Sequence, residues 1–204
     1  LEKTGYINMG YGDTSSRILN HLANICEFPV NVVSLTGGVN YYLPNTRSSI
    51  FNAKLYLTPA PLLMASEDIV KAMEQEPRVK QIRHMATLAQ MSIVGIGGVD
   101  SNATLLTNGT LNHSDVLLLS MQGAVGDMLC HFIDKDGNVI QSSLERRLMS
   151  TPLEQLKEMS NSIGVAGGST KSEAILAALK GNYLDVLITD ETTATNVLRL
   201  KNQE

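Results

Sequence analysis

Residues 5–26 read GYINMGYGDTSSRILNHLANIC, and this order of residue types indicates the class of fold. The apolar residues 5–9 predict a short strand, which a glycine-rich turn ends. Residues 14–26 predict a helix because their apolar side chains recur at helical spacing, with Asp13 or Thr14 as the N-cap. A strand, a glycine turn and a helix in succession begin the repeating unit of parallel sheets.

The same rhythm continues along the chain. Further strands are predicted at 29–35, 91–96, 162–166 and 185–189, and further helices at about 47–55, 67–75, 77–89, 114–122, 152–159, 170–180 and 190–199. Alternating strands and helices indicate an α/β fold with a Rossmann-like, mainly parallel sheet flanked by helices.

One region departs from this alternation and predicts a small antiparallel element. Residues 124–133 predict a single strand, and Asp134-Lys-Asp-Gly-Asn138 predicts a hairpin turn into residues 139–141. Residues 56–64 contain Pro59 and Pro61, which favour an edge strand or a linker.

Length and composition predict one soluble globular domain that spans residues 1–204. The net charge is −4 without any basic run, so this chain alone is not expected to bind nucleic acid. Cys26 and Cys130 lack metal-ligand spacing and predict free thiols of a reducing, cytoplasmic compartment. Apolar runs stay shorter than the ~18 residues of a membrane span.

Four glycine-bearing loops follow predicted strands, at 10–14, 36–38, 97–98 and 167–170. A glycine turn that leads into a helix exposes backbone N–H groups at the positive end of the helix dipole, which suits an anion. Single glycine turns are common for structural reasons, and both the dinucleotide fingerprint and the Walker lysine motif are missing. Together the four loops predict a ligand crevice at the carboxyl edge of the sheet.

Two charged residues stand out near these loops. Lys171 lies in the first turn of a predicted helix, where the dipole disfavours a cation unless an anion faces it. Asp127 lies within an apolar strand and therefore needs partners, which sugar hydroxyls or Lys171 would supply. A solvated lysine and a backbone-capping aspartate remain the structural alternatives.

The sequence predicts no catalytic set, no cofactor and no metal site. The four histidines are scattered without metal-ligand spacing, and the serines lack a nucleophile elbow. Asp190 and Glu191 resemble a pair of acids after a strand, but a helix N-cap with a first-turn acid explains them equally well and is preferred.

Several segments in fixed order carry a resemblance to a known family. They read GAVGD at 123–127, VAGGSTKSEAI at 165–175 and LITDETTA at 187–194, with GYGDT at 10–14, LTGG at 35–38 and PAP at 59–61 in the first half. This set resembles the sugar-binding domain of SorC-type transcriptional regulators over nearly the whole chain. Residues 41–44, YYLP, favour the branch named for sorbose regulation.

The resemblance implies a fold like that of glucosamine-6-phosphate deaminase and ribose-5-phosphate isomerase, without their catalysis. It implies that a phosphorylated sugar is the effector, with its phosphate at the loop of Gly12, Asp13 and Thr14 near Lys171, and its hydroxyls at Asp127. The loop of Thr36, Gly37 and Gly38 would line the pocket, and Gly123 and Gly167 complete the implied ligand-binding set.

The full-length protein would carry an N-terminal helix-turn-helix domain, absent from this chain, that binds operator DNA. It would form a homo-oligomer, either a dimer or a tetramer. Two departures from relatives matter: the negative charge of Asp13 would repel phosphate, and Thr36 replaces an arginine that some relatives have.

Two other functions remain open at this stage. A sugar-phosphate isomerase or deaminase on the same fold would need a general base, for which Asp127 with Lys171 is the one candidate pair. A nucleotide-binding domain is the weaker alternative because the dinucleotide fingerprint is missing.

Overall fold

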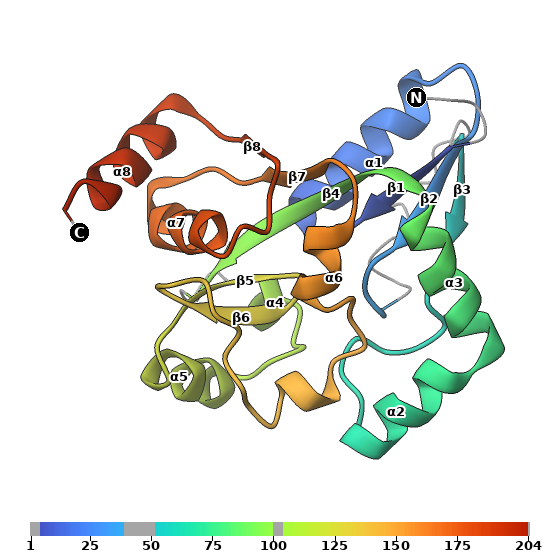
Figure 1. Ribbon diagram of the computed structural model, residues 1–204, viewed down its shortest axis with the longest axis horizontal. Coiled ribbons are helices and arrows are strands. Elements are labelled where there is room, and N and C mark those ends of the chain that lie inside the picture. Colours follow the sequence, from blue (N-terminus) through green and yellow to red (C-terminus); the bar gives the residue numbers. More distant parts are fainter. Residues whose placement is uncertain (1–4, 39–51, 100–103, 204) are drawn as a thin grey trace.

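A computed structural model describes residues 5–38, 52–99 and 104–203 of the chain (Figure 1). Six parallel strands lie side by side in the order β3-β2-β1-β4-β7-β8. Their bounds are β1 Tyr6–Met9, β2 Val30–Ser34, β3 Ala53–Tyr56, β4 Ala89–Gly98, β7 Ser162–Val165 and β8 Val186–Ile188. The predicted mainly parallel α/β fold is confirmed.

Strand β4 is the longest of the described strands, and its two halves pair with different strands. Residues up to Gly95 pair in parallel with β1 on one side and β7 on the other. Ile96–Gly98 continue beyond them and pair with β5 (Ala124–Met128), which in turn pairs with β6 (His131–Asp134), both antiparallel. The antiparallel element is therefore an extension of the central strand (Figure 1).

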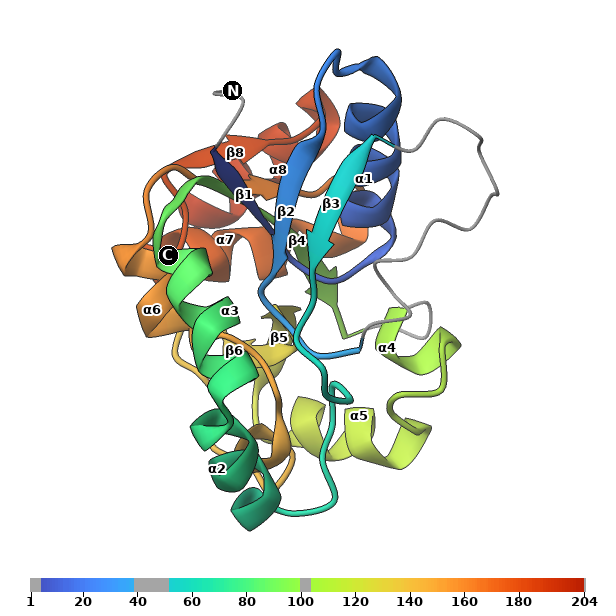
Figure 2. The same ribbon diagram turned by 90° about the vertical axis from the view of Figure 1, so that its right-hand side faces the viewer.

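The helices cover the two faces of the sheet unequally. Helix α1 (Asp13–Ile25) packs on one face through Leu19, against β-strand residues such as Val32 and Ile93. Four helices contribute to the core on the opposite face: α3 Pro77–Thr87, α6 Leu153–Glu158, α7 Ser172–Lys180 and α8 Glu191–Lys201. Figure 2 shows α1 to the right of strands β1, β2 and β3 and α3 to their lower left.

The remaining helices are peripheral. They are α2 (Glu67–Gln75), α4 (Thr104–Thr107) and α5 (His113–Met121), together with the short 3₁₀ helices η2 (Glu145–Arg147) and η3 (Ser169–Lys171). Of these, α2 starts at Ser66, whose hydroxyl accepts the Ile69 N–H, and α3 follows at once with Pro77 in its first turn. The predicted boundaries of both helices are confirmed to within two residues.

The predicted helix at 47–55 is wrong in its described part. Ala53–Tyr56 form strand β3, which pairs in register with Val30–Val33 of β2. The ladder to β2 supplies backbone hydrogen bonds that local propensity cannot anticipate, and so tertiary pairing overrides the helical pattern. Residues 47–51, like the Tyr41–Pro44 loop, lie outside the described residues.

The predicted single strand at 124–133 is also wrong. It is two strands joined by Leu129 and Cys130, whose φ angles are 52° and 69°. No glycine, asparagine or proline marks this turn, and so the sequence carries no turn signal. The later turn is confirmed: Gly137 has φ 84°, Asp134 accepts the N–H groups of Asp136 and Asn138, and Ile133 bridges to Val139.

Candidate functional site

A cavity of about 210 Å³ opens where the carboxyl ends of β1 and β4 diverge. From β1 the parallel sheet grows in one direction through β2 and β3, and from β4 it grows in the other direction through β7 and β8. The boundary between β1 and β4 is therefore the topological switch point, where α/β sheets bind ligands. The described lining residues are Tyr11, Gly12, Asp13, Thr14, Ser15, Gly95, Ile96, Gly97, Leu105, Asp127, Leu129 and Lys171.

The N-terminus of α1 forms one wall of this cavity. Gly12 is the N-cap, with φ 125° and ψ 166°, a conformation that is essentially restricted to glycine. The helix therefore begins at Asp13, and the prediction that Asp13 or Thr14 caps it is wrong. No side chain of the described residues caps α1, which leaves its first turn and its positive dipole end facing the cavity.

Lys171 enters the cavity from the opposite wall. It ends η3 and is the N-cap residue of α7, so it lies one position before the first helical residue, Ser172, and not within the first turn as predicted. Its Nζ donates to the Ile96 carbonyl oxygen at 3.0 Å rather than forming an ion pair with Asp127. The cavity thus holds one ammonium group among its described residues, anchored to β4.

Asp127 lies beside the end of β4, directly opposite Gly97 in the antiparallel register. Burial raises the pKa of its carboxyl to about 6, an effect that the Cys130 N–H, at 3.2 Å from Oδ2, and the Lys171 charge partly offset. A side chain at position 97 would overlap Oδ1 of Asp127, so glycine there is a condition for this placement.

The second glycine turn, Gly167–Ser169, is closed by the protein itself. The Gly168 N–H donates to Asp190 Oδ2 at 3.2 Å and to Thr193 Oγ1 at 2.8 Å. Asp190 is the N-cap of α8, as predicted, and it accepts the Thr193 N–H at 2.9 Å. These hydrogen bonds hold the pKa of Asp190 below its ordinary value. Gly167 belongs to this closed turn and not to the cavity.

Four other residues expected in the ligand set lie apart from the cavity. Thr36 is buried and bridges to Ser150, while the Gly37 and Gly38 N–H groups donate to the carbonyl oxygens of Met149 and Ala60 at 2.6 and 2.8 Å. Gly123 has φ 93° in the turn between α5 and β5. The structure brings together Gly12, Asp13, Thr14, Asp127 and Lys171.

Sequence reasoning missed several lining residues because it read residues 97–98 as a loop. They end strand β4, and Gly95, Ile96 and Gly97 line the cavity from there. The Gly-x-Gly spacing within an apolar strand was an available signal for close backbone approach. Leu129 had no such signal, since its position depends on the unpredicted turn.

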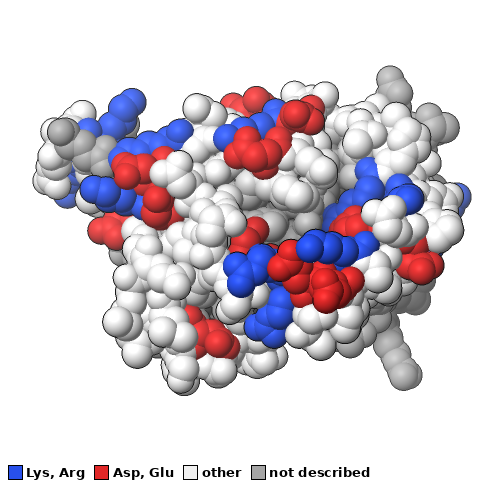
Figure 3. All heavy atoms as spheres, turned by 60° about the horizontal axis from the view of Figure 1, so that its bottom comes forward, with Lys and Arg blue, Asp and Glu red and all other residues white. Residues whose placement is uncertain are grey.

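On the face in Figure 3 positive and negative side chains lie interspersed. Glu67, for example, pairs with both Lys71 and Arg146, at 2.7 and 3.3 Å. Within the described ranges no cluster of acidic, histidine and cysteine side chains has the makeup of a metal site, and no helix is long and apolar enough to span a bilayer.

Comparisons with known proteins agree with the fold and the motifs. The family model "Putative sugar-binding domain" matches residues 1–199. Transcriptional regulator LsrR of Klebsiella pneumoniae is 34% identical over 204 residues, which cover 98% of this chain and 63% of that protein. LsrR of Escherichia coli K12 is 34% identical over 203 residues, covering 98% and 64%. The chain thus spans a little under two thirds of these relatives.

Two solved structures show the same fold. A domain of a possible sugar-binding transcriptional regulator from Arthrobacter aurescens superposes with TM-score 0.80 at 26% identity, covering 95% of this chain and 78% of that one. The full-length sorbitol operon regulator SorC from Klebsiella pneumoniae superposes with TM-score 0.78 at 24% identity, covering 97% and 66%.

Proposed function

The chain belongs to the sugar-binding domain family of SorC-type transcriptional regulators, and from this premise we propose that it senses a phosphorylated sugar without chemically changing it. The observation that carries the proposal is the pairing of an uncapped helix N-terminus with a lysine across one cavity. Backbone N–H donors and a cation both favour a bound phosphate, and the N-terminus of α1 and Lys171 supply them in one cavity.

Asp127 supports a sugar as the rest of the effector. Its carboxylate can accept hydrogen bonds from two hydroxyl groups, and it lies in the same cavity as the proposed phosphate site. The charge of Asp13 opposes an anion, but Arg17 pairs with it at 2.8 Å on the exposed surface of α1 and partly offsets it. The net lining therefore favours a ligand with one phosphate and several hydroxyls.

The enzymatic alternative would have to use the same two side chains, Asp127 and Lys171. An isomerase or deaminase needs a general base and a proton relay that reach the sugar carbon chain. Lys171 is held by the Ile96 carbonyl, and Asp127 already accepts the Cys130 N–H. Turnover of a ketose phosphate or amino-sugar phosphate by this domain, abolished by Asp127→Asn, would establish the enzymatic function instead.

The role of the full-length protein is part of the same proposal. The relatives are named as transcriptional regulators and extend well beyond the length of this chain. We propose that the full-length protein also has a helix-turn-helix domain that binds operator DNA, that it forms a homo-oligomer, and that it acts in the cytoplasm. Effector binding would then favour one of two arrangements of the assembly and so change its affinity for DNA.

The test is a thermal-shift screen of the domain with hexose and pentose monophosphates, each beside its unphosphorylated parent sugar. A ligand at about 100 times its Kd adds ~2.7 kcal/mol of stability, a readily measured rise in Tm. We expect a phosphorylated member to raise Tm, its parent sugar to have no effect, and Lys171→Ala to abolish the rise. Lys54→Ala, an exposed change on β3, is the control.

Equal shifts with and without the phosphate would contradict the phosphate site. The absence of any shift at millimolar concentration, with the folded state intact, would overturn the assignment of this cavity.

A further inference from the structure

A turn with an unusual backbone forms part of the cavity wall. Leu129 and Cys130 join β5 to β6 as a two-residue turn, and both have positive φ angles, 52° and 69°. Two positive angles define a type I′ turn, in which asparagine and glycine are the usual residues because other side chains crowd the backbone. Such a conformation persists only where the surrounding structure holds it.

Two hydrogen bonds and the packing hold this turn. The Ser150 hydroxyl donates to the Leu129 carbonyl oxygen at 2.7 Å, and the Cys130 N–H donates to Asp127 Oδ2 at 3.2 Å. The Leu129 side chain is buried and lies so close to Gly10 that a Cβ there would be 2.9 Å from Leu129 Cδ2. The turn is therefore fixed on one side by Ser150 and on the other by a residue of the cavity.

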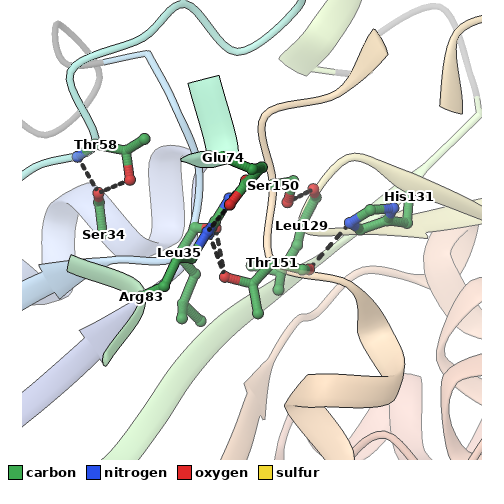
Figure 4. A network of polar contacts seen from close by, with 9 residues as sticks. All are labelled: Ser34, Leu35, Thr58, Glu74, Arg83, Leu129, His131, Ser150 and Thr151. Carbon is green, nitrogen blue, oxygen red and sulfur yellow. Dashed lines mark hydrogen bonds and ion pairs between the residues drawn. The ribbon is translucent and has the colours of Figure 1, made fainter. Parts of the chain in front are cut away.

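Ser150 is itself held firmly by its neighbour. The Thr151 N–H and hydroxyl both donate to the Leu35 carbonyl oxygen at 2.8 Å, and Arg83 Nη1 donates to Thr151 Oγ1 at 2.7 Å. His131 Nε2 lies 3.0 Å from the Thr151 carbonyl oxygen. Figure 4 shows these contacts joining Leu35, which follows β2, Arg83 of α3 and His131 of β6 to Thr151, the residue next to Ser150.

Asp127 has little freedom left once the turn is fixed. Gly97 lies against Oδ1, and the Cys130 N–H contacts Oδ2, so the carboxylate is located from both sides. If the turn relaxed toward a conformation with negative φ, the Cys130 N–H would point elsewhere and Asp127 would lose one of these two constraints.

We propose that Ser150 is a positioning residue of the effector cavity: its hydroxyl keeps the Leu129–Cys130 turn in place, and the turn orients the carboxylate of Asp127. The positioning itself needs no ligand. Its consequence for sugar recognition rests on the proposed function, so two separate measurements test the two parts.

The first measurement is the hydrogen-exchange rate of the Cys130 amide, followed by NMR without ligand. The variant is Ser150→Ala, and the matched control is Ser162→Ala, which removes another buried hydroxyl that donates to a main-chain carbonyl, that of Leu156 at 3.1 Å. We expect exchange at Cys130 to be about tenfold faster in Ser150→Ala than in Ser162→Ala, the change for one hydrogen bond of ordinary strength.

Equal exchange rates in these two variants would overturn the proposal. Should Ser150→Ala not fold, Ser150→Cys takes its place, since it keeps the size of the side chain but has a much weaker hydrogen-bond donor for the Leu129 carbonyl oxygen. Unchanged protection of the Cys130 amide in that variant would contradict the proposal equally.

The second measurement is a double-mutant cycle of Ser150→Ala and Asp127→Asn on the Kd of the monophosphate found in the thermal-shift screen. We expect Ser150→Ala to weaken binding about tenfold in the wild-type background and by much less in Asp127→Asn. Equal weakening in both backgrounds would show that Ser150 does not act through Asp127. If the domain binds no monophosphate but shows the expected change in exchange rate, the positioning role of Ser150 stands and the proposed function fails.

Discussion

The two glycine turns that lead into helices are alike in sequence, but only one of them has its backbone N–H groups bonded by side chains of the protein. Gly10–Gly12 leaves the first turn of α1 without a side-chain cap at the edge of a cavity. Gly167–Ser169 has its Gly168 N–H bound to Asp190 and Thr193 of the same chain. A glycine turn is therefore open to a ligand only where no side chain of the protein already accepts its backbone N–H groups.

The carboxylates beside the two turns differ in the same way. Asp127 faces the open cavity, and burial raises its pKa to about 6. Asp190 fills the closed turn, and its hydrogen bonds to Thr193 and Gly168 lower its pKa. The ionised carboxylate of Asp127 costs stability in its buried position, whereas that of Asp190 stabilises the fold.

The largest expected effect comes from closing the open cavity with a single methyl group. Gly97→Ala places a Cβ on Oδ1 of Asp127 and should destabilise the domain by about 3 kcal/mol, in the range for overpacking. It should also abolish the monophosphate-induced rise in Tm. Urea unfolding measures the stability, with Gly95→Ala as control because its Cβ would meet only an ordinary contact, 3.8 Å from the Tyr11 carbonyl oxygen. Equal losses in both variants would contradict the steric argument.

The next effect is the pH dependence that Asp127 adds. Its folded-state pKa of about 6 lies above the ordinary value of 3.8, so the folded state binds more protons between these pH values. Stability therefore falls as pH rises from about 4 to about 6, and Asp127→Asn should be more stable than the wild type by roughly 2–3 kcal/mol at pH 7. Below pH 4 the difference should vanish. A wild type as stable as the variant at pH 7 would refute the raised pKa.

Replacing one glycine in each turn by alanine tests whether only the first turn contributes to monophosphate binding. Gly12 and Gly168 have φ 125° and 107°, and in both cases an added Cβ meets no atom within 4 Å. Backbone strain alone should then destabilise Gly12→Ala and Gly168→Ala by about 2 kcal/mol each. Only Gly12→Ala should weaken monophosphate binding, as measured by isothermal titration. Equal loss of binding in both would mean that the second turn also contributes to the site.

The smallest effect is expected from the closed turn. Asp190→Ala removes the N-cap of α8 and the acceptor of the Gly168 N–H, so its Tm should fall below that of the control Glu191→Ala. The lowered pKa of Asp190 means that its contribution is complete above pH 4 and is lost as the pH falls further, the opposite of Asp127. A Tm difference that persists in strong acid would contradict this assignment.

Part of the cavity lining could be predicted because its signals are local. A few residues suffice to recognise the strand–turn–helix unit around Gly12. The same is true of the charged residues Asp127, within an apolar strand, and Lys171, near a helix start. All three positions line the cavity. The N-cap of α8 at Asp190 is equally local. These predictions rest on backbone preferences and on the cost of burying or misplacing a charge.

Other features had no local signal. The β3 strand forms because it pairs with β2, a strand about 20 residues earlier in the chain, and the residues of β3 themselves give no sign of that pairing. The Leu129–Cys130 turn lacks any turn residue and is held by Ser150, which lies 21 residues away from the carbonyl that it binds. The loop of Thr36, Gly37 and Gly38 has the composition of a ligand loop, yet Met149 and Ala60 take up its N–H groups.

The α/β alternation, the family and the identity of the charged residues near the glycine turns follow from the order of residues alone. Only the tertiary structure decided which turn stays open, because the side chain that closes a turn comes from a distant segment: Asp190 reaches Gly168 across 22 residues. Local sequence sets φ angles and helix starts within a few residues, whereas the partner of each backbone N–H depends on which segments the fold brings together.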